Sequence, residues 1–139
     1  FTLSPDGSGG FTVTFEVVFE TAGQADLTVT GISNTINPAA PTSTFVTPDA
    51  ATRFVATTTT PAVTAGGLAA VQVGVRDQFN NAVTTFSGTV QLTAPTDTNS
   101  LVSAPAPVTV TLTNGAGSGQ ILLRVAGTRT VLVTGTLGT

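Results

Sequence analysis

The chain has 139 residues and a net charge of −3, and it contains no Cys, Met, Trp, Tyr, His or Lys. Their absence excludes imidazole and thiol chemistry, lysine Schiff bases and soft-ligand metal sites, so we expect neither an enzyme nor a cofactor. The four arginines are scattered, which argues against nucleic-acid binding. No apolar run approaches the ~20 residues of a membrane span, so we expect no membrane insertion in this segment.

Thr, Gly and Pro dominate what remains: 30 Thr, 15 Gly and 8 Pro. Thr is β-branched and suits a half-hydrated strand face, while Gly and Pro punctuate turns. Because 40% of the residues are hydrophobic, a core can form. The composition predicts an all-β protein.

The first 33 residues repeat a pattern found at the end of the chain. Residues 21–31 align without gaps on 125–135, so Ala22-Gly23 matches Ala126-Gly127 and Val29-Thr30-Gly31 matches Val133-Thr134-Gly135. An internal repeat of this kind indicates tandem modules. We therefore expect 1–33 to be the C-terminal strands of a preceding, incomplete module, whose missing strands lie upstream, come from another molecule or are replaced by packing on the second module.

Residues 34–51 are rich in proline and predict a stiff, extended linker. Within this linker, Phe45 and Val46 are candidates for a short edge pairing and for a contact with a neighbouring module or partner.

Residues 52–139 show about seven alternating segments separated by turn residues, which predict one complete sandwich of two antiparallel sheets. The predicted strands are Arg53–Thr58, Ala69–Arg76, Val83–Phe86, Gly88–Thr93, Pro107–Thr113, Gln120–Val125 and Thr130–Thr134, with a loop over 94–106 and a possible strandlet at Leu101-Val102.

Several motifs of this region resemble bacterial immunoglobulin-like repeats of the invasin and intimin type, which occur in tandem in large surface proteins. They are the Val-alternating strand 71–75, the turn Asp77-Gln78-Phe79-Asn80-Asn81-Ala82-Val83 and the strand Gly88-Thr89-Val90. The resemblance implies an immunoglobulin-like Greek-key β-sandwich and an extracellular or bacterial cell-surface location. The sequence departs from the repeat pattern at Asn80, where Gly is usual; Asn also tolerates positive φ, so we expect the turn to persist.

Asp77, Asn80 and Asn81 form the densest polar cluster. Oxygen ligands from a tight loop suit calcium, but a single carboxylate favours the simpler interpretation that these side chains cap local backbone N–H groups. Phe79, in the same turn, either plugs one end of the sandwich or contacts a neighbouring module.

Three other groups of polar residues carry weaker hypotheses. Glu16 and Glu20 are expected on one strand about 13 Å apart, a solvated face rather than a hydrolytic pair. The threonines at 57–60 suit O-linked sugars or an ordinary edge strand, and Ser87 has no visible base.

The sequence therefore favours a non-enzymatic structural module, a stalk or adhesin spacer that contacts neighbouring modules of the same or another chain, with any host or surface ligand bound by other modules. One alternative is a self-assembling subunit of a filament, sheath or coat joined by strand complementation. Another is a carbohydrate-binding sandwich, which the lack of Trp and Tyr disfavours.

Overall fold

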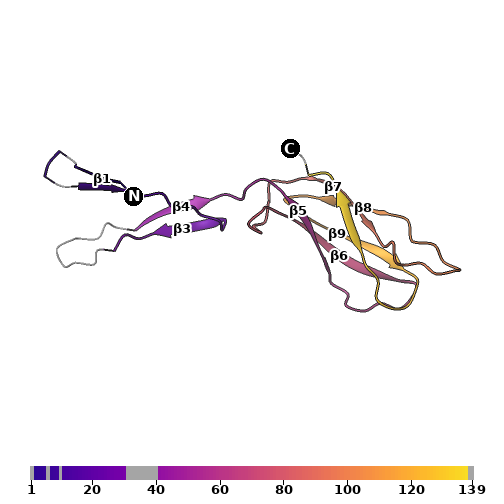
Figure 1. The fold of residues 1–139 in the computed structure, drawn as a ribbon. Coiled ribbons are helices and arrows are strands. Elements are labelled where there is room, and N and C mark those ends of the chain that lie inside the picture. Colours follow the sequence, from indigo (N-terminus) through magenta and orange to yellow (C-terminus); the bar gives the residue numbers. More distant parts are fainter. Residues whose placement is uncertain (1, 6, 10, 31–40, 138–139) are drawn as a thin grey trace. The chain divides into compact units, whose positions relative to one another are not determined.

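The computed structural model describes residues 2–5, 7–9, 11–30 and 41–137 (Figure 1). This part of the chain is all-β, with antiparallel sheets and no helix, as the composition predicts. The chain divides into two units, Phe1–Val46 and Thr47–Thr139, which are described separately below.

The first unit consists of two separate hairpins. Strand β1 (Thr2–Pro5) pairs with β2 (Phe11–Thr14), and β3 (Gly23–Leu27) pairs with β4 (Thr42–Val46). Where the structure describes side-chain burial in this unit, no residue is buried. Apolar side chains therefore stay exposed; they include Val13, Phe15, Val17, Val18, Val29 and Phe45.

Two expectations for the first unit need correction. The range expected to be a linker, 34–51, contains β4, so 42–46 belong to the first unit; residues 34–40 of that range lie outside the described residues. Residues 15–20 form no strand, so Glu16 and Glu20 do not share a strand face. The period-2 pattern is present there, but none of the described strands pairs with this segment.

The second unit contains two three-stranded antiparallel sheets (Figure 1). In the first sheet, β6 (Gly67–Arg76) lies between β5 (Arg53–Thr58) and β9 (Ala116–Leu123). In the second, β7 (Gly88–Thr93) lies between β8 (Val108–Leu112) and β10 (Leu132–Gly135).

One apolar core fills the space between these sheets. Strand β6 alternates as the sequence predicts, since Val71, Val73 and Val75 are buried. They pack with side chains from the opposite sheet and from β9; the largest of these are Leu92, Val90, Leu112, Val110 and Ile121. Burying each such side chain contributes about 1.5–3 kcal/mol, so this core stabilises the second unit substantially. The structure is thus consistent with a β-sandwich.

The passage from β8 to β9 carries the chain from one sheet to the other. It turns at Asn114 and Gly115, with φ of 53° and 74°, values that Asn and Gly adopt most readily. Strand β9 then passes close to the opposite sheet, because a Cβ on Gly119 would lie 2.5 Å from Cγ2 of Val110. Glycine here allows the close approach of two sheets.

Several predicted boundaries in this unit were wrong. Strand β9 begins at Ala116 rather than at Gln120. In the sequence, Gly117 and Gly119 suggest a loop, but in the structure they allow the strand to lie close to the opposite sheet. Val83–Phe86 is not a strand; only an isolated bridge joins Arg76 to Ala82. Leu101, proposed to lie in a strandlet, is 92% exposed in a loop.

Candidate functional site

The turn after β6 is organised by the buried carboxylate of Asp77. Its Oδ1 accepts the backbone N–H groups of Phe79 at 2.9 Å and Asn81 at 2.8 Å. Its Oδ2 accepts the Asn81 side-chain amide at 2.9 Å and the N–H of Asp49 at 3.0 Å. Four donors therefore hold one fully buried carboxylate.

The same hydrogen bonds set the charge state of Asp77. Burial by itself would raise its pKa, but the bonds from Asn81, Asp49 and Phe79 outweigh burial and hold the pKa below its usual value. Asp77 is therefore ionised at neutral pH.

Arginines surround the outer part of this turn. Arg53 donates to the carbonyl oxygen of Asp77 at 3.1 Å and to Oδ1 of Asn80 at 2.7 Å, and Arg76 donates to the carbonyl oxygen of Asn80 at 3.4 Å. Asn80 has a φ of 72°, a backbone conformation that Asn tolerates better than most residues other than Gly.

The structure brings Asp77, Asn80 and Asn81 together, as the sequence suggests, and their side chains form hydrogen bonds that hold the turn. N–H donors occupy both carboxylate oxygens of Asp77 and the side-chain oxygen of Asn80. Calcium would need these same oxygens. Over the described ranges, no group of three or more acidic, His or Cys residues is placed to share a metal ion.

Two of the three proposed contact residues, Phe79 and Phe45, are exposed at the surface. Phe79 is 41% exposed and does not belong to the core, so the expected plug is not formed. Phe45 is 74% exposed on β4, and Val46, at the end of that strand, is half-buried. A contact between these side chains and a neighbour remains a prediction.

A second buried carboxylate, Asp97, was not anticipated from the sequence. Its Oδ2 accepts the N–H of Arg124 at 2.8 Å and its Oδ1 the N–H of Val125 at 2.9 Å. The Nε of Arg129 lies 3.7 Å from Oδ1. Burial alone would raise the pKa of Asp97, but these N–H groups and the charges of Arg129 and Arg124 lower it.

Arg129 ties the same loop together through three carbonyl groups. It donates to the carbonyl oxygens of Val125 at 2.9 Å and Thr96 at 3.2 Å, and also to that of Ala126. The loop after β7 is thereby joined to the segment that leads into β10. The only signal in the sequence was an Asp in a polar loop, which does not reveal partners about 30 residues away.

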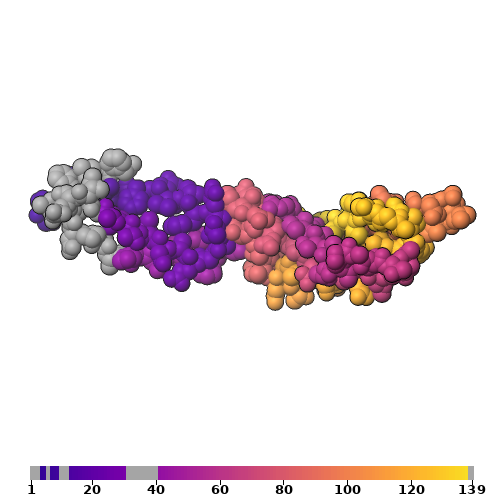
Figure 2. Space-filling model, turned by 90° about the horizontal axis from the view of Figure 1, so that it is seen from below, coloured from indigo at the N-terminus to yellow at the C-terminus, as the bar shows by residue number. Residues whose placement is uncertain are grey.

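A cleft of about 580 Å³ opens beside Arg129, which is one of the residues that line it. It lies between the second half of β5 with the loop that follows, on one side, and residues 127–131 on the other. In Figure 2, the yellow C-terminal segment lies beside the magenta segment that contains β5. Its lining combines two kinds of side chain. The apolar ones include Ala56, Val63, Ala69, Val71, Leu123 and Val131, and the polar ones are Thr58, Thr60, Thr128 and Arg129.

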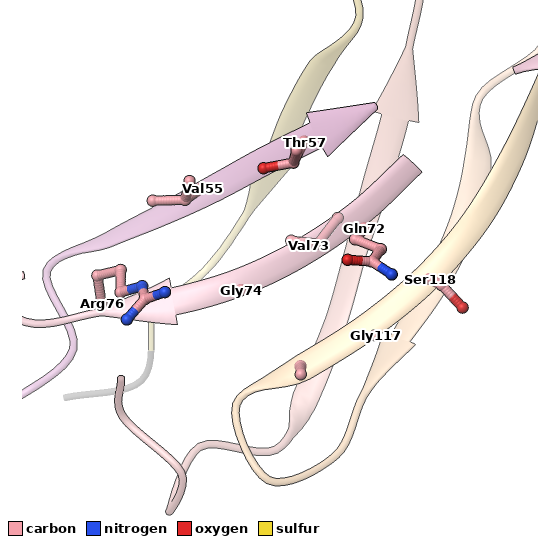
Figure 3. A pocket seen from close by; sticks show the side chains of 9 residues that line it. Val55, Thr57, Gln72, Val73, Gly74, Arg76, Gly117 and Ser118 are labelled. Carbon is pink, nitrogen blue, oxygen red and sulfur yellow. The ribbon is translucent and has the colours of Figure 1, made fainter. Parts of the chain in front are cut away.

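A shallower hollow of about 510 Å³ lies on the outer face of the sheet β5-β6-β9 (Figure 3). Gly74, which has no side chain, leaves its floor open between Val55 and Ala116 on the neighbouring strands. Arg76 is the charged residue that lines it, and neither Asp nor Glu contributes. The hollow therefore lacks an acid–base pair for catalysis.

The remaining candidates have local roles. The hydroxyl of Thr60 accepts the N–H of Ala70 at 2.9 Å, and Thr58 donates to the carbonyl oxygen of Thr60 at 2.9 Å. These threonines finish the edge strand, the simpler of the two interpretations. Phe54 and Phe86 pack edge to face at 5.9 Å, so neither ring forms part of an exposed sugar-binding row.

Comparisons with protein-family models, with curated proteins and with solved structures find no match for this chain. Among the described residues, no helix is long and apolar enough to cross a membrane.

Proposed function

We propose that the chain is a non-enzymatic structural segment of a bacterial extracellular or cell-surface protein, in which immunoglobulin-like Greek-key sandwiches follow one another as a stalk or adhesin spacer. The observation that carries this proposal is the internal repeat, because residues 21–31 in the first unit and 125–135 in the second share one ungapped pattern. The resemblance of residues 71–92 to bacterial surface repeats supports the location.

The chemistry of the second unit supports a mechanical role. Its two buried carboxylates, Asp77 and Asp97, are both engaged by backbone N–H groups of distant segments. Such bonds fix loops to the sandwich and resist their separation. A spacer depends on this kind of cross-connection, whereas catalysis needs polar groups directed at a substrate.

Single-molecule extension of the full chain tests this proposal. The strands of the second unit run from Arg53 to Gly135, so cooperative unfolding should release a contour length of roughly 25–30 nm in one event. Gradual extension without a discrete event would exclude a load-bearing spacer.

One observation favours a second candidate function, a subunit that assembles by strand complementation. The first unit forms only hairpins, and none of its residues with described burial is buried. Two-stranded hairpins are at best marginally stable in water. Strands from another chain would cover the apolar side chains that these hairpins leave exposed.

A further inference from the structure

The two copies of the internal repeat differ in one structural respect. In the first copy, Gly23–Leu27 form β3, which pairs along its length with β4. The aligned residues 127–131 of the second copy form no strand, and β10 begins only at Leu132. One sequence pattern is thus paired in the first copy and unpaired in the second.

The unpaired segment forms one wall of the 580 Å³ cleft. Among the described strands, β10 pairs only with β7, and β5 only with β6, so both strands that flank the cleft have a free edge. Further along β10 the two sheets come together, since a Cβ on Gly135 would lie 3.2 Å from the ring of Phe54 on β5. A strand can therefore enter beside 127–131 but not beside Gly135.

The hydrogen bond of Thr130 bears on how the backbone beside the cleft can pair. The N–H of Thr130 donates to Oγ1 of Thr96, in the loop after β7, at 3.0 Å. In a strand, adjacent N–H groups point to opposite edges, so those of Arg129 and Val131 would face the open side once an incoming strand draws this segment into a ladder. The guanidinium of Arg129 is bound to loop carbonyl groups and does not guard this edge with a free charge.

We propose that this cleft is the acceptor site for a β-strand and that β4 of a second copy of the chain is the strand it takes. This deepens the second candidate function and does not depend on the stalk role. The β3–β4 register, carried over to 127–131, sets Thr42 opposite Val131, Thr44 opposite Arg129 and Val46 opposite Gly127. Opposite residues share a face, so these three side chains point inward with Val131 and cover the apolar walls.

The chain's own β4 cannot reach this position in the cleft, because the residues that follow it are tethered. Asp49 is held at the Asp77 turn by a 3.0 Å hydrogen bond, next to Arg53. Three residues from Asp49 back to Val46 span at most about 11 Å. The cleft extends to Thr60, on the order of 23 Å beyond Arg53 along an extended chain. A second copy carries no such tether.

Releasing β4 from β3 disrupts little packing. The ladder between them buries no side chain, and it includes one side-chain hydrogen bond, from Ser43 to Asp26 at 2.6 Å. Addition of an extended strand to an open sheet edge is an established mode of association. The donated strand gains a partly apolar cleft in place of an exposed hairpin.

The test uses the intact chain, labelled with ¹⁵N, and a synthetic peptide of residues 41–49. We expect the peptide to slow amide exchange of Arg129 and Val131 about tenfold or more, because both would enter a ladder. A matched peptide carrying Thr44→Pro should change these rates less than twofold, since proline blocks pairing. Unchanged amides with the native peptide, or equal effects of both peptides, would overturn the acceptor site.

Light scattering over a concentration series then tests the donor. We expect dimers or larger species that the native peptide disperses, and a chain carrying Thr44→Pro that stays monomeric with an unchanged Tm for its second unit. A wild-type chain that remains monomeric at every concentration would overturn the second copy as donor. The extension experiment reads the second unit alone, so failure of the stalk proposal and failure of this one remain distinguishable.

Discussion

The carboxylate of Asp97 lies 3.7 Å from Nε of Arg129, and no solvent reaches the aspartate, while the arginine side chain is 19% exposed. The pair lies where the loop after β7 meets the segment before β10. Because the carboxylate also binds two backbone N–H groups, it holds in place the wall of the proposed acceptor cleft.

Neutralising Asp97 should destabilise the second unit. In Asp97→Asn, an amide replaces one acceptor oxygen with a donor that faces N–H groups. We expect Tm to fall by on the order of 10 °C, measured by circular dichroism. Glu16→Gln, an exposed change of the same chemistry, is the control and should leave Tm within about 1 °C.

Stability should fall in acid because the pKa values of Asp77 and Asp97 are both lowered in the folded state. A carboxylate whose pKa is lowered by folding contributes its full stabilisation at a pH above its unfolded pKa of about 3.9. This stabilisation is lost as the pH falls through the folded pKa. We expect a constant urea midpoint between pH 5 and 8, because the chain has no His. Below about pH 4 the midpoint should drop, and the double variant Asp77→Asn, Asp97→Asn should flatten this slope. A drop of equal size in that variant would contradict the assignment.

Two leucines provide a matched test of the core. Leu92 is fully buried and Leu101 is 92% exposed. Leu92→Ala should lower the free energy of unfolding by about 2–5 kcal/mol through lost burial and a cavity. Leu101→Ala should change it by less than about 0.5 kcal/mol. Urea denaturation measures both; similar losses in the two variants would contradict the packing described here.

Two glycines in neighbouring strands should respond in opposite ways to the same substitution. A Cβ on Gly117 would lie 2.7 Å from Cδ2 of Leu112 and overlap the carbonyl oxygen of Thr111. Gly117→Ala should therefore lower unfolding free energy by about 1–3 kcal/mol. A Cβ on Gly74 meets nothing within 4 Å, so Gly74→Ala should be neutral or stabilise by up to about 1 kcal/mol. Chemical denaturation decides, and a stabilised Gly117→Ala would refute the close approach of the sheets.

Local patterns predicted much of the second unit. Strand β5 and strand β7 have the predicted bounds, and β6 buries the three valines that its alternation selects. The turn at Asp77 was also recognisable, because Asp and Asn bind backbone N–H groups within a few residues. These features depend on side-chain period and on short-range hydrogen bonds, which a sequence displays directly.

The sequence by itself determined the all-β class, the alternating strands and the repeat that joins 21–31 to 125–135. Only the tertiary structure decided that Asp97 meets Arg124 and Arg129, that glycines in β9 lie against the opposite sheet, and that β3 is paired while 127–131 line a cleft. The physical reason is the range of the interactions. Strand period is a property of neighbouring residues, whereas a buried ion pair, a close approach or a free edge depends on which distant segments meet.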